Sequence, residues 1–352
     1  MFKIIFLSIP TLALILDAIQ ETGKISNRVN KFIYFFSIGL LLNIVFAFRA
    51  PGVGLFYDYQ SYKIIFSTSN LQNLFNVQGG SEFGFNFLCY IIRLIFGNNY
   101  CIFLFICGTI ILIGLFAFIN AYSSCIWLST LLAIFMGGYF TSYNILRQWI
   151  AIVIYLNLIK FILLNDTRKF VIGCLLASTI HFSCLILIPF YFLFNAKNKK
   201  VIALCIAVLI LSIFTPNILI NFIPQIGKLE NLKTTAVAEG NSLRTLIKQI
   251  VILLFYQVNV FEKLINLNDE TDRFFYMCTI FSLVMAILGI NYPIIQRMSH
   301  YFMVPSIVAI PTYIYRKYYQ STRLGYILIW IVMALVYANA GTFKWEFSWI
   351  WG

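Results

Sequence analysis

The chain has 352 residues, of which 61% are hydrophobic and 11% are charged, and its mean hydropathy is +0.88. Soluble globular proteins are about half apolar and about a quarter charged, so this composition excludes a soluble fold and indicates that the bilayer solvates much of the chain. The formal net charge is +13, and the Lys and Arg residues lie mostly in short loops between apolar runs. Because no basic stripe is interleaved with aromatic residues, we exclude nucleic acid as a partner.

Apolar runs of near-spanning length recur along the chain. They occupy 2–19, 31–48, 100–119, 124–142, 145–164, 168–194, 200–216, 244–260, 274–291, 299–315 and 324–340. The run at 168–194 is long and has basic flanks, which predicts two short helices in a hairpin with its apex near Ser178–Phe182. The segment 83–97 is short and carries Arg93, which predicts a helix that lies in the membrane interface or re-enters the membrane. We expect an all-α integral membrane protein, a polytopic helical bundle of about 11–12 transmembrane helices, with 1–352 as a single membrane domain.

The distribution of Lys and Arg predicts the orientation. The loops on one side, which include 165–169, 195–200 and 261–273, contain 13 Lys and Arg in 50 residues, whereas the loops on the other side contain 9 in 107 residues. The denser side is predicted to be cytoplasmic. The two long hydrophilic loops, 49–99 and 217–243, then face outward.

Polar residues near the predicted outer face need an explanation. In the first external loop, Arg49, Asp58 and Tyr62 lie close together in sequence, and Glu82 stands at the start of the interfacial helix. A solvated loop with a helix-capping Glu is the plain alternative. Arg147 stands with Gln148 at the outer end of a span, against the positive-inside bias, where snorkelling to the headgroups is the alternative to a functional role.

Of the two histidines, His181 lies in membrane-embedded sequence, whereas for His300 a place at the membrane interface is the plain alternative. His181 is at the apex of the predicted hairpin, where a core histidine with satisfied hydrogen bonds is the alternative to a general base. Arg297 and His300 open another span on the same predicted side. Cations, carboxylates and a His on one face suit an anionic substrate and a proton to be removed. No Walker loop, HExxH motif or metal-ligand spacing occurs, so no metal or cofactor is expected.

The order of these motifs resembles a known family. The succession D58-Y-x3-Y62, E82-x-G84-F, R147-Q-x2-A151, H181-x-S183 and R297-x3-Y301-F resembles the EpsG-type branch of the O-antigen and capsule polymerases, the Wzy-like proteins. The resemblance implies a membrane glycosyltransferase of the C-type architecture at the outer face of the bacterial inner membrane. Its substrates would be oligosaccharide repeat units linked to undecaprenyl pyrophosphate, joined usually with inversion. The resemblance also leaves open a protein partner that regulates chain length.

These expectations assign roles to the residues. Arg147 and Arg297 would bind the leaving pyrophosphate, with Arg49 and Arg244 as second-rank candidates. His181 is the first choice for the base that takes the acceptor's proton, followed by Glu82 or Asp58. The substrate-binding set is completed by Tyr59, Tyr62 and Gln148, of which the two tyrosines would pack against sugar rings. A flippase or transporter for lipid-linked oligosaccharide and an O-antigen ligase remain as alternatives.

Overall fold

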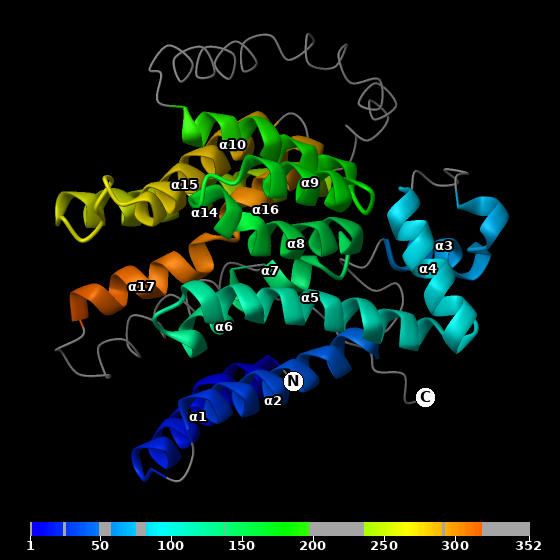
Figure 1. The fold of residues 1–352 in the computed structure, drawn as a ribbon, viewed down its shortest axis with the longest axis horizontal. Coiled ribbons are helices and arrows are strands. Elements are labelled where there is room, and N and C mark those ends of the chain that lie inside the picture. The colour runs from blue at the N-terminus through cyan, green and yellow to red at the C-terminus, as the bar shows by residue number, and fades with distance from the viewer. Residues whose placement is uncertain are drawn as a thin grey trace. The chain divides into compact units, whose positions relative to one another are not determined.

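The structure is a computed structural model that describes residues 2–23, 26–48, 58–74, 82–136, 138–196, 236–290 and 293–318 (Figure 1). Within these ranges the regular secondary structure is entirely helical. The prediction of a polytopic all-α membrane protein is thereby confirmed. The expected spans at 200–216 and 324–340 lie outside the described residues, so the number of about 11–12 crossings stays a prediction.

The described helices have the following bounds, in chain order. They are α1 (Phe2–Glu21), α2 (Asn27–Ala47), α3 (Asp58–Thr68), the 3-10 helix η1 (Leu71–Asn73), α4 (Phe83–Phe96), α5 (Tyr100–Tyr122), α6 (Ile126–Phe135), α7 (Gly138–Thr141), α8 (Leu146–Leu163), α9 (Thr167–Ser178), the 3-10 helix η3 (Phe182–Ile186), α10 (Leu187–Asn195), α14 (Ala236–Phe261), α15 (Glu270–Leu288), α16 (Pro293–Met303) and α17 (Ser306–Tyr318).

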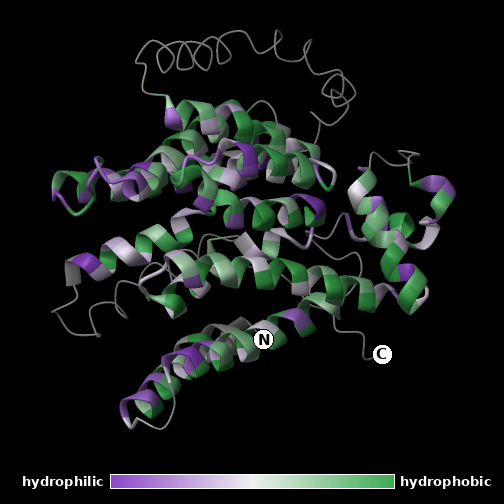
Figure 2. Ribbon diagram, viewed as in Figure 1, coloured by the Kyte–Doolittle hydropathy of each residue, from purple (hydrophilic) through white to green (hydrophobic). Residues whose placement is uncertain are grey.

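Four described helices are long and apolar enough to cross a membrane, namely α2, α5, α8 and α15. Figure 2 shows apolar residues along much of the length of these helices, with hydrophilic residues gathered at several helix ends and connections. The helices begin where local chemistry caps them. The Asn99 side chain accepts hydrogen bonds from the first turn of α5, and Asp269 accepts one from Asp272 N at 2.9 Å at the start of α15.

The predicted hairpin at 168–194 is present as two helical stretches. Helix α9 ends at Ser178, the residues 179–181 are not helical, and η3 begins at Phe182 and leads into α10. The His181 N–H still donates to the Ala177 carbonyl at 3.0 Å, so the chain turns tightly at the end of α9. The apex therefore lies where the sequence predicted it.

Three other expectations need correction. The apolar run 299–315 is not one helix, because Pro305 has no N–H to donate and the chain breaks between α16 and α17. The run 124–142 is divided into α6 and α7. The expected external loops contain more helix than predicted, since α3 occupies Asp58–Thr68 and α14 already begins at Ala236.

The described residues fall into two compact units. Unit 1 comprises those within 1–157, 175–182 and 310–352, and unit 2 those within 158–174 and 183–309. In unit 1, the Asn43 amide of α2 donates to Phe105 O at 3.1 Å and to Thr109 Oγ1 at 2.7 Å. In lipid, apolar side chains have no preference for another helix over the lipid tails. Interhelical hydrogen bonds such as these therefore help to hold α2 and α5 together.

Unit 2 is built around an aromatic cluster and a hydrogen bond between separate segments. Phe190 of α10 lies edge-on to the rings of Phe281 in α15 and Phe302 in α16, each with a centroid separation of 4.9 Å. The hydroxyls of Ser183 and Tyr301 are 3.1 Å apart, which joins two of the sequence motifs within this unit.

Candidate active site

Glu82 occupies the N-cap position of α4 but does not cap the helix. Its side chain makes no capping hydrogen bond. Instead, Glu82 Oε2 accepts from Arg147 Nη1 at 2.6 Å, and Glu82 Oε1 lies 2.9 Å from His181 Nδ1. The Phe182 backbone N–H donates to the same Oε1 at 3.1 Å. One carboxylate therefore joins three segments of unit 1 that are far apart in sequence, and the capping interpretation is wrong.

The three side chains are partly buried. Glu82 retains 20% of its side-chain exposure, Arg147 18% and His181 25%. Partial burial strengthens the attraction between these charges relative to an ion pair in bulk water. Burial alone would raise the pKa of Glu82, but the hydrogen bond with His181 and the charge of Arg147 outweigh it and hold the pKa of this carboxyl below its usual range. Glu82 is thus an anion at neutral pH.

The ionised carboxylate fixes which nitrogen of His181 carries the proton. A carboxylate can only accept hydrogen bonds, so the Nδ1 that faces Glu82 Oε1 is the protonated nitrogen in the neutral ring. The lone pair of the neutral imidazole then lies on Nε2. A carboxylate that orients an imidazole in this way also stabilises the imidazolium that forms when Nε2 takes a proton. The contact therefore suits Glu82 to orient the His181 ring, whichever role that ring has.

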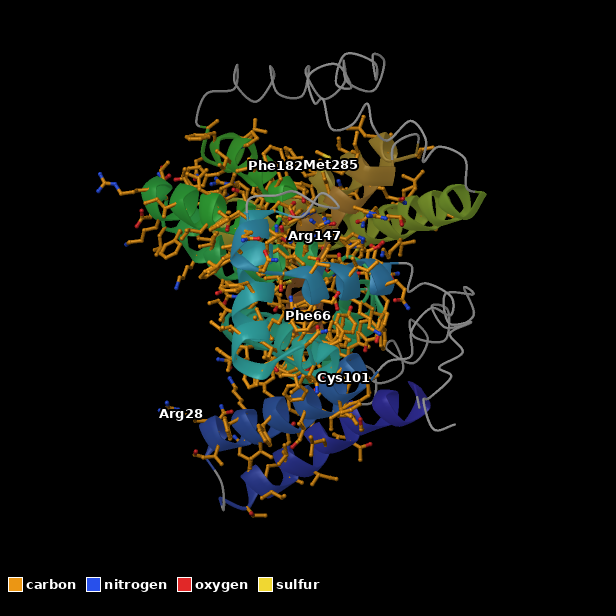
Figure 3. The ribbon with its side chains drawn as sticks, turned by 90° about the vertical axis from the view of Figure 1, so that its right-hand side faces the viewer. Arg28, Phe66, Cys101, Arg147, Phe182 and Met285 are labelled. Carbon is orange, nitrogen blue, oxygen red and sulfur yellow. The ribbon has the colours of Figure 1, made fainter. Side chains whose placement is uncertain are left out.

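Arg147 is held among packed side chains rather than extended to a headgroup. Besides its ion pair with Glu82, its charge acts on the Tyr62 side chain of α3, and its guanidinium lies over the Phe85 ring of α4, 5.8 Å from the centroid. In Figure 3, Arg147 lies among the packed side chains, whereas Arg28 extends clear of the ribbon. The snorkelling interpretation therefore does not describe this arginine.

A close backbone contact positions the start of α4 against the hairpin apex. The Gly84 N–H donates to the Thr179 carbonyl at 2.7 Å. A Cβ at position 84 would lie 2.8 Å from that oxygen and 2.9 Å from the carbonyl carbon, closer than real Cβ atoms approach. Only glycine fits here, and its small size lets Glu82 reach His181 and the Phe182 N–H.

The remaining predicted residues are placed as follows. Asp58 begins α3 one turn before Tyr62. The charge of Asp58 acts on Tyr62, so Asp58 lies near the side chains that surround Arg147. Tyr62 is buried edge-on to Phe85, and Tyr59 is buried edge-on to Tyr100. Gln148 is buried within α8. Packing of the two tyrosines against a sugar stays a prediction.

Three predicted arginines are not part of the described cluster in unit 1. Arg297 belongs to α16 in unit 2, where its side chain is exposed. Arg49 lies outside the described residues, and Arg244 belongs to α14 at a position whose side chain is not described. Among the residues that the structure describes, no group of three or more His, Cys, Asp or Glu side chains has the proximity to hold a metal ion.

Gly84 and Phe85 belong to a motif quoted from the sequence, but the sequence assigned them no role, and Thr179 and the Phe182 N–H were not predicted. Gly84, Thr179 and the Phe182 backbone N–H fix the approach of α4 to the apex, and Phe85 lies beneath the Arg147 guanidinium. One signal was available, because a glycine two residues after a Glu at a helix start is unfavourable for the helix and suggests close packing.

The model of the EpsG family matches residues 32–349, which is nearly the whole chain and includes every member of the cluster. The chain belongs to the EpsG family. Searches of curated proteins and of solved structures each found no match. Membership in the EpsG family indicates a membrane protein with a polymerase-like, glycosyltransferase-type function in polysaccharide biosynthesis.

Proposed function

We propose that this chain polymerises oligosaccharide repeat units linked to undecaprenyl pyrophosphate, as an inverting glycosyltransferase at the outer face of the bacterial inner membrane. The observation that carries the proposal is the Glu82–His181 pair with Arg147 on the second carboxylate oxygen. A sugar hydroxyl is a poor nucleophile until its proton is taken, and the pair supplies a base for that step.

The proposed reaction has one displacement step. The acceptor hydroxyl oxygen attacks the anomeric carbon of the donor sugar, and His181 Nε2 takes the hydroxyl proton. The bond from the anomeric carbon to the pyrophosphate oxygen breaks, and undecaprenyl pyrophosphate leaves with the electron pair. Attack opposite the leaving group inverts the anomeric configuration. The growing chain is thereby transferred to the non-reducing end of the new lipid-linked unit.

The roles of the two charged partners follow from their contacts. Glu82 keeps His181 in the Nδ1-protonated tautomer and stabilises the imidazolium after proton transfer. Arg147 keeps Glu82 ionised and fixed, and a guanidinium is the kind of group that binds phosphate oxygens of the donor. The leaving pyrophosphate needs charge stabilisation more than protonation, which an arginine provides.

Purified lipid-linked repeat units and the full-length protein in nanodiscs provide the test. The native protein should form polymer, and His181→Gln should slow chain growth by about 10²–10⁴-fold, because Gln keeps hydrogen bonding but lacks basicity. The variant should reach native protein levels and keep its affinity for the donor. Polymer formation at the native rate by His181→Gln would exclude His181 as the base and leave Glu82 or Asp58 for that role.

Glycolipid analysis of a deletion strain separates the alternatives. Loss of a polymerase leaves single lipid-linked units on the outer face. Polymer that accumulates on its lipid carrier would indicate a ligase, and units trapped at the cytoplasmic face would indicate a flippase. Either of the last two outcomes would overturn the proposed function.

A further inference from the structure

Helix α4 has apolar side chains on two faces, of which one is buried within unit 1. On the buried face, Phe85 lies edge-on to Tyr62 of α3 and to Phe103 of α5, with centroid separations of 5.8 and 6.2 Å, and Ile92 is 3% exposed. Packing against α3 and α5 therefore explains this face, and the other apolar face needs a separate explanation.

The other face carries a stripe of large side chains that begins beside Glu82. Phe83, Phe87, Tyr90 and Leu94 follow one another at the spacings that place residues on one line along a helix. Phe83, Phe87 and Leu94 are 42%, 46% and 66% exposed, and the rings of Phe83 and Phe87 stack with their centroids 6.1 Å apart. At a rise of about 1.5 Å per residue, the line from Phe83 to Leu94 is about 16 Å long. We call these four residues the α4 stripe.

The chemistry of the α4 stripe fits an apolar chain rather than a charged headgroup. None of its four side chains carries a charge at neutral pH. The charged residue of α4, Arg93, lies off the stripe and donates to the Ser69 carbonyl at 2.7 Å. A helix that lies on a membrane by binding headgroups has a strongly charged face, which α4 lacks. Its exposed surface is instead stabilised by apolar contact, at about 25 cal/mol per Å² buried.

The place where the α4 stripe begins indicates which apolar chain it meets. Phe83 directly follows Glu82, whose carboxylate contacts His181. In the proposed reaction, the donor's pyrophosphate is bonded to the anomeric carbon under attack, so the donor's lipid begins one diphosphate away from the reacting atoms. The acceptor reacts at its non-reducing end, so a whole repeat unit separates its lipid from those atoms. A stripe that begins beside Glu82 therefore suits the lipid of the donor and not that of the acceptor.

We propose that the α4 stripe binds the polyprenyl chain of the donor, with the isoprene units nearest the diphosphate at Phe83 and the more distal units toward Leu94. This inference rests on the proposed function and deepens it, because it assigns the donor's lipid to one helix and excludes the acceptor's lipid from it. The chain held along α4 would place the anomeric carbon beside His181.

A single-transfer assay with the full-length protein in zwitterionic nanodiscs tests the proposal. The donor lacks the hydroxyl to which a further unit is added, and the acceptor carries a plain alkyl group in place of the lipid pyrophosphate, so each substrate has one role only. The donor is prepared with an undecaprenyl chain and with a short geranyl chain. For each donor, the ratio of variant KM to native KM is measured, so that differences in membrane partitioning cancel.

Substitutions at the two ends of the α4 stripe should affect the two donors differently. Leu94→Ala should raise KM for the undecaprenyl donor about five- to tenfold with kcat nearly unchanged, because it removes apolar contact with the distal chain. It should leave KM for the geranyl donor unchanged, since the short chain ends before Leu94. Phe83→Ala should raise KM for both donors. Leu94→Met keeps the apolar volume and should restore native KM.

Ile113→Ala is the matched control, because Ile113 of α5 belongs to the same unit and is 65% exposed but is not part of the α4 stripe. It should leave KM for both donors at the native value. An equal rise in KM in Ile113→Ala and Leu94→Ala would show a general effect of packing in the bilayer and contradict the proposal. Native KM for the undecaprenyl donor in Leu94→Ala, or an equal rise for both donors, would also overturn it.

Photolabelling separates failure of this inference from failure of the proposed function. Undecaprenyl pyrophosphate with a photoreactive group on the isoprene next to the diphosphate should label α4, and excess unlabelled undecaprenyl pyrophosphate should suppress the labelling. If the native protein makes no polymer but α4 is labelled, the polymerase function is wrong and the polyprenyl site stands. If the native protein makes polymer, Leu94→Ala has native KM and the label lies outside α4, the site is wrong and the function stands.

Discussion

At the scale of single residues, the Glu82 carboxylate accepts hydrogen bonds from three donors, and each donor makes a different contribution. Arg147 supplies charge, Phe182 N–H supplies a fixed backbone donor, and His181 supplies a ring whose second nitrogen remains available for a proton. Each donor favours the ionised carboxylate, which is why its pKa stays below the usual range despite partial burial.

Substitution of Glu82 by Gln should affect both catalysis and acid stability. Without the carboxylate, His181 loses its preferred tautomer and the stabilisation of its imidazolium, so polymer formation at neutral pH should fall at least about hundredfold. Because the native pKa is lowered, ionised Glu82 stabilises the fold above the ordinary Glu pKa of about 4.3, and this contribution is lost as pH falls through the native value.

Thermal unfolding of native protein and Glu82→Gln across pH should test this linkage. The difference in unfolding temperature should be constant above about pH 6 and should shrink below about pH 4. Glu262→Gln removes an exposed carboxylate and is the control. A difference that grows on acidification would mean that Glu82 is protonated in the native state.

Arg147 should act through the geometry of its guanidinium as well as its charge. Its side chain contacts Glu82, Tyr62 and the Phe85 ring, and a Lys ammonium cannot reach all of these at once. Arg147→Lys should fold and insert but lose most polymerisation. Arg168→Lys, at an exposed position, is the control and should be neutral. Full polymer from Arg147→Lys would mean that charge alone suffices.

At the scale of elements, the group formed by Glu82, Arg147 and His181 depends on how α4 meets the apex after α9. The positions of α4 and of the apex were predictable, because a short apolar segment with an internal Arg and a long run with basic flanks are both local patterns. Their contact was not predictable. It depends on the Gly84–Thr179 backbone hydrogen bond, a tertiary feature without a periodic signal. Pro305 by itself predicts a helix break. The apolar run 299–315 around it nevertheless led us to expect one helix.

Gly84→Ala should show that this contact positions the cluster. The added Cβ meets the Thr179 carbonyl, which is backbone and cannot rotate away, so α4 must shift at a cost of about 1–3 kcal/mol. We expect Glu82 to move from His181 and polymerisation to fall, with the protein still inserted. Gly39→Ala is the control, since its Cβ meets only a Phe116 ring edge at 3.1 Å. The double variant that combines Gly84→Ala with Thr179→Ala should be as impaired as Gly84→Ala alone, because the Thr179 backbone carbonyl remains in place. Native activity of Gly84→Ala would exclude a positioning role.

At the scale of the whole molecule, the sequence predicted the class better than the arrangement. Composition and apolar runs predicted an all-α membrane protein, and the order of motifs indicated the EpsG family, which the family match over 32–349 confirms. Charge density placed Glu82, Arg147 and His181 on one face, and the structure brings these three together in unit 1. The charge density of the loops did not indicate that Arg297 and His300 share unit 2 with Lys248, because hydropathy carries no information on which helices pack together.

The orientation of the chain remains a prediction, and single cysteines in a cysteine-free background test it. Lys and Arg are concentrated in loops such as 261–273, which predicts that these loops are cytoplasmic. Asn268 and Asn98 are both exposed and lie in loops of opposite predicted side. In intact cells, a membrane-impermeant maleimide should label a cysteine at position 98 but label one at position 268 only after permeabilisation. Polymer formation by both variants is the control for folding. Labelling of position 268 alone in intact cells would place Glu82, Arg147 and His181 at the cytoplasmic side, where units not yet exported would be the substrate.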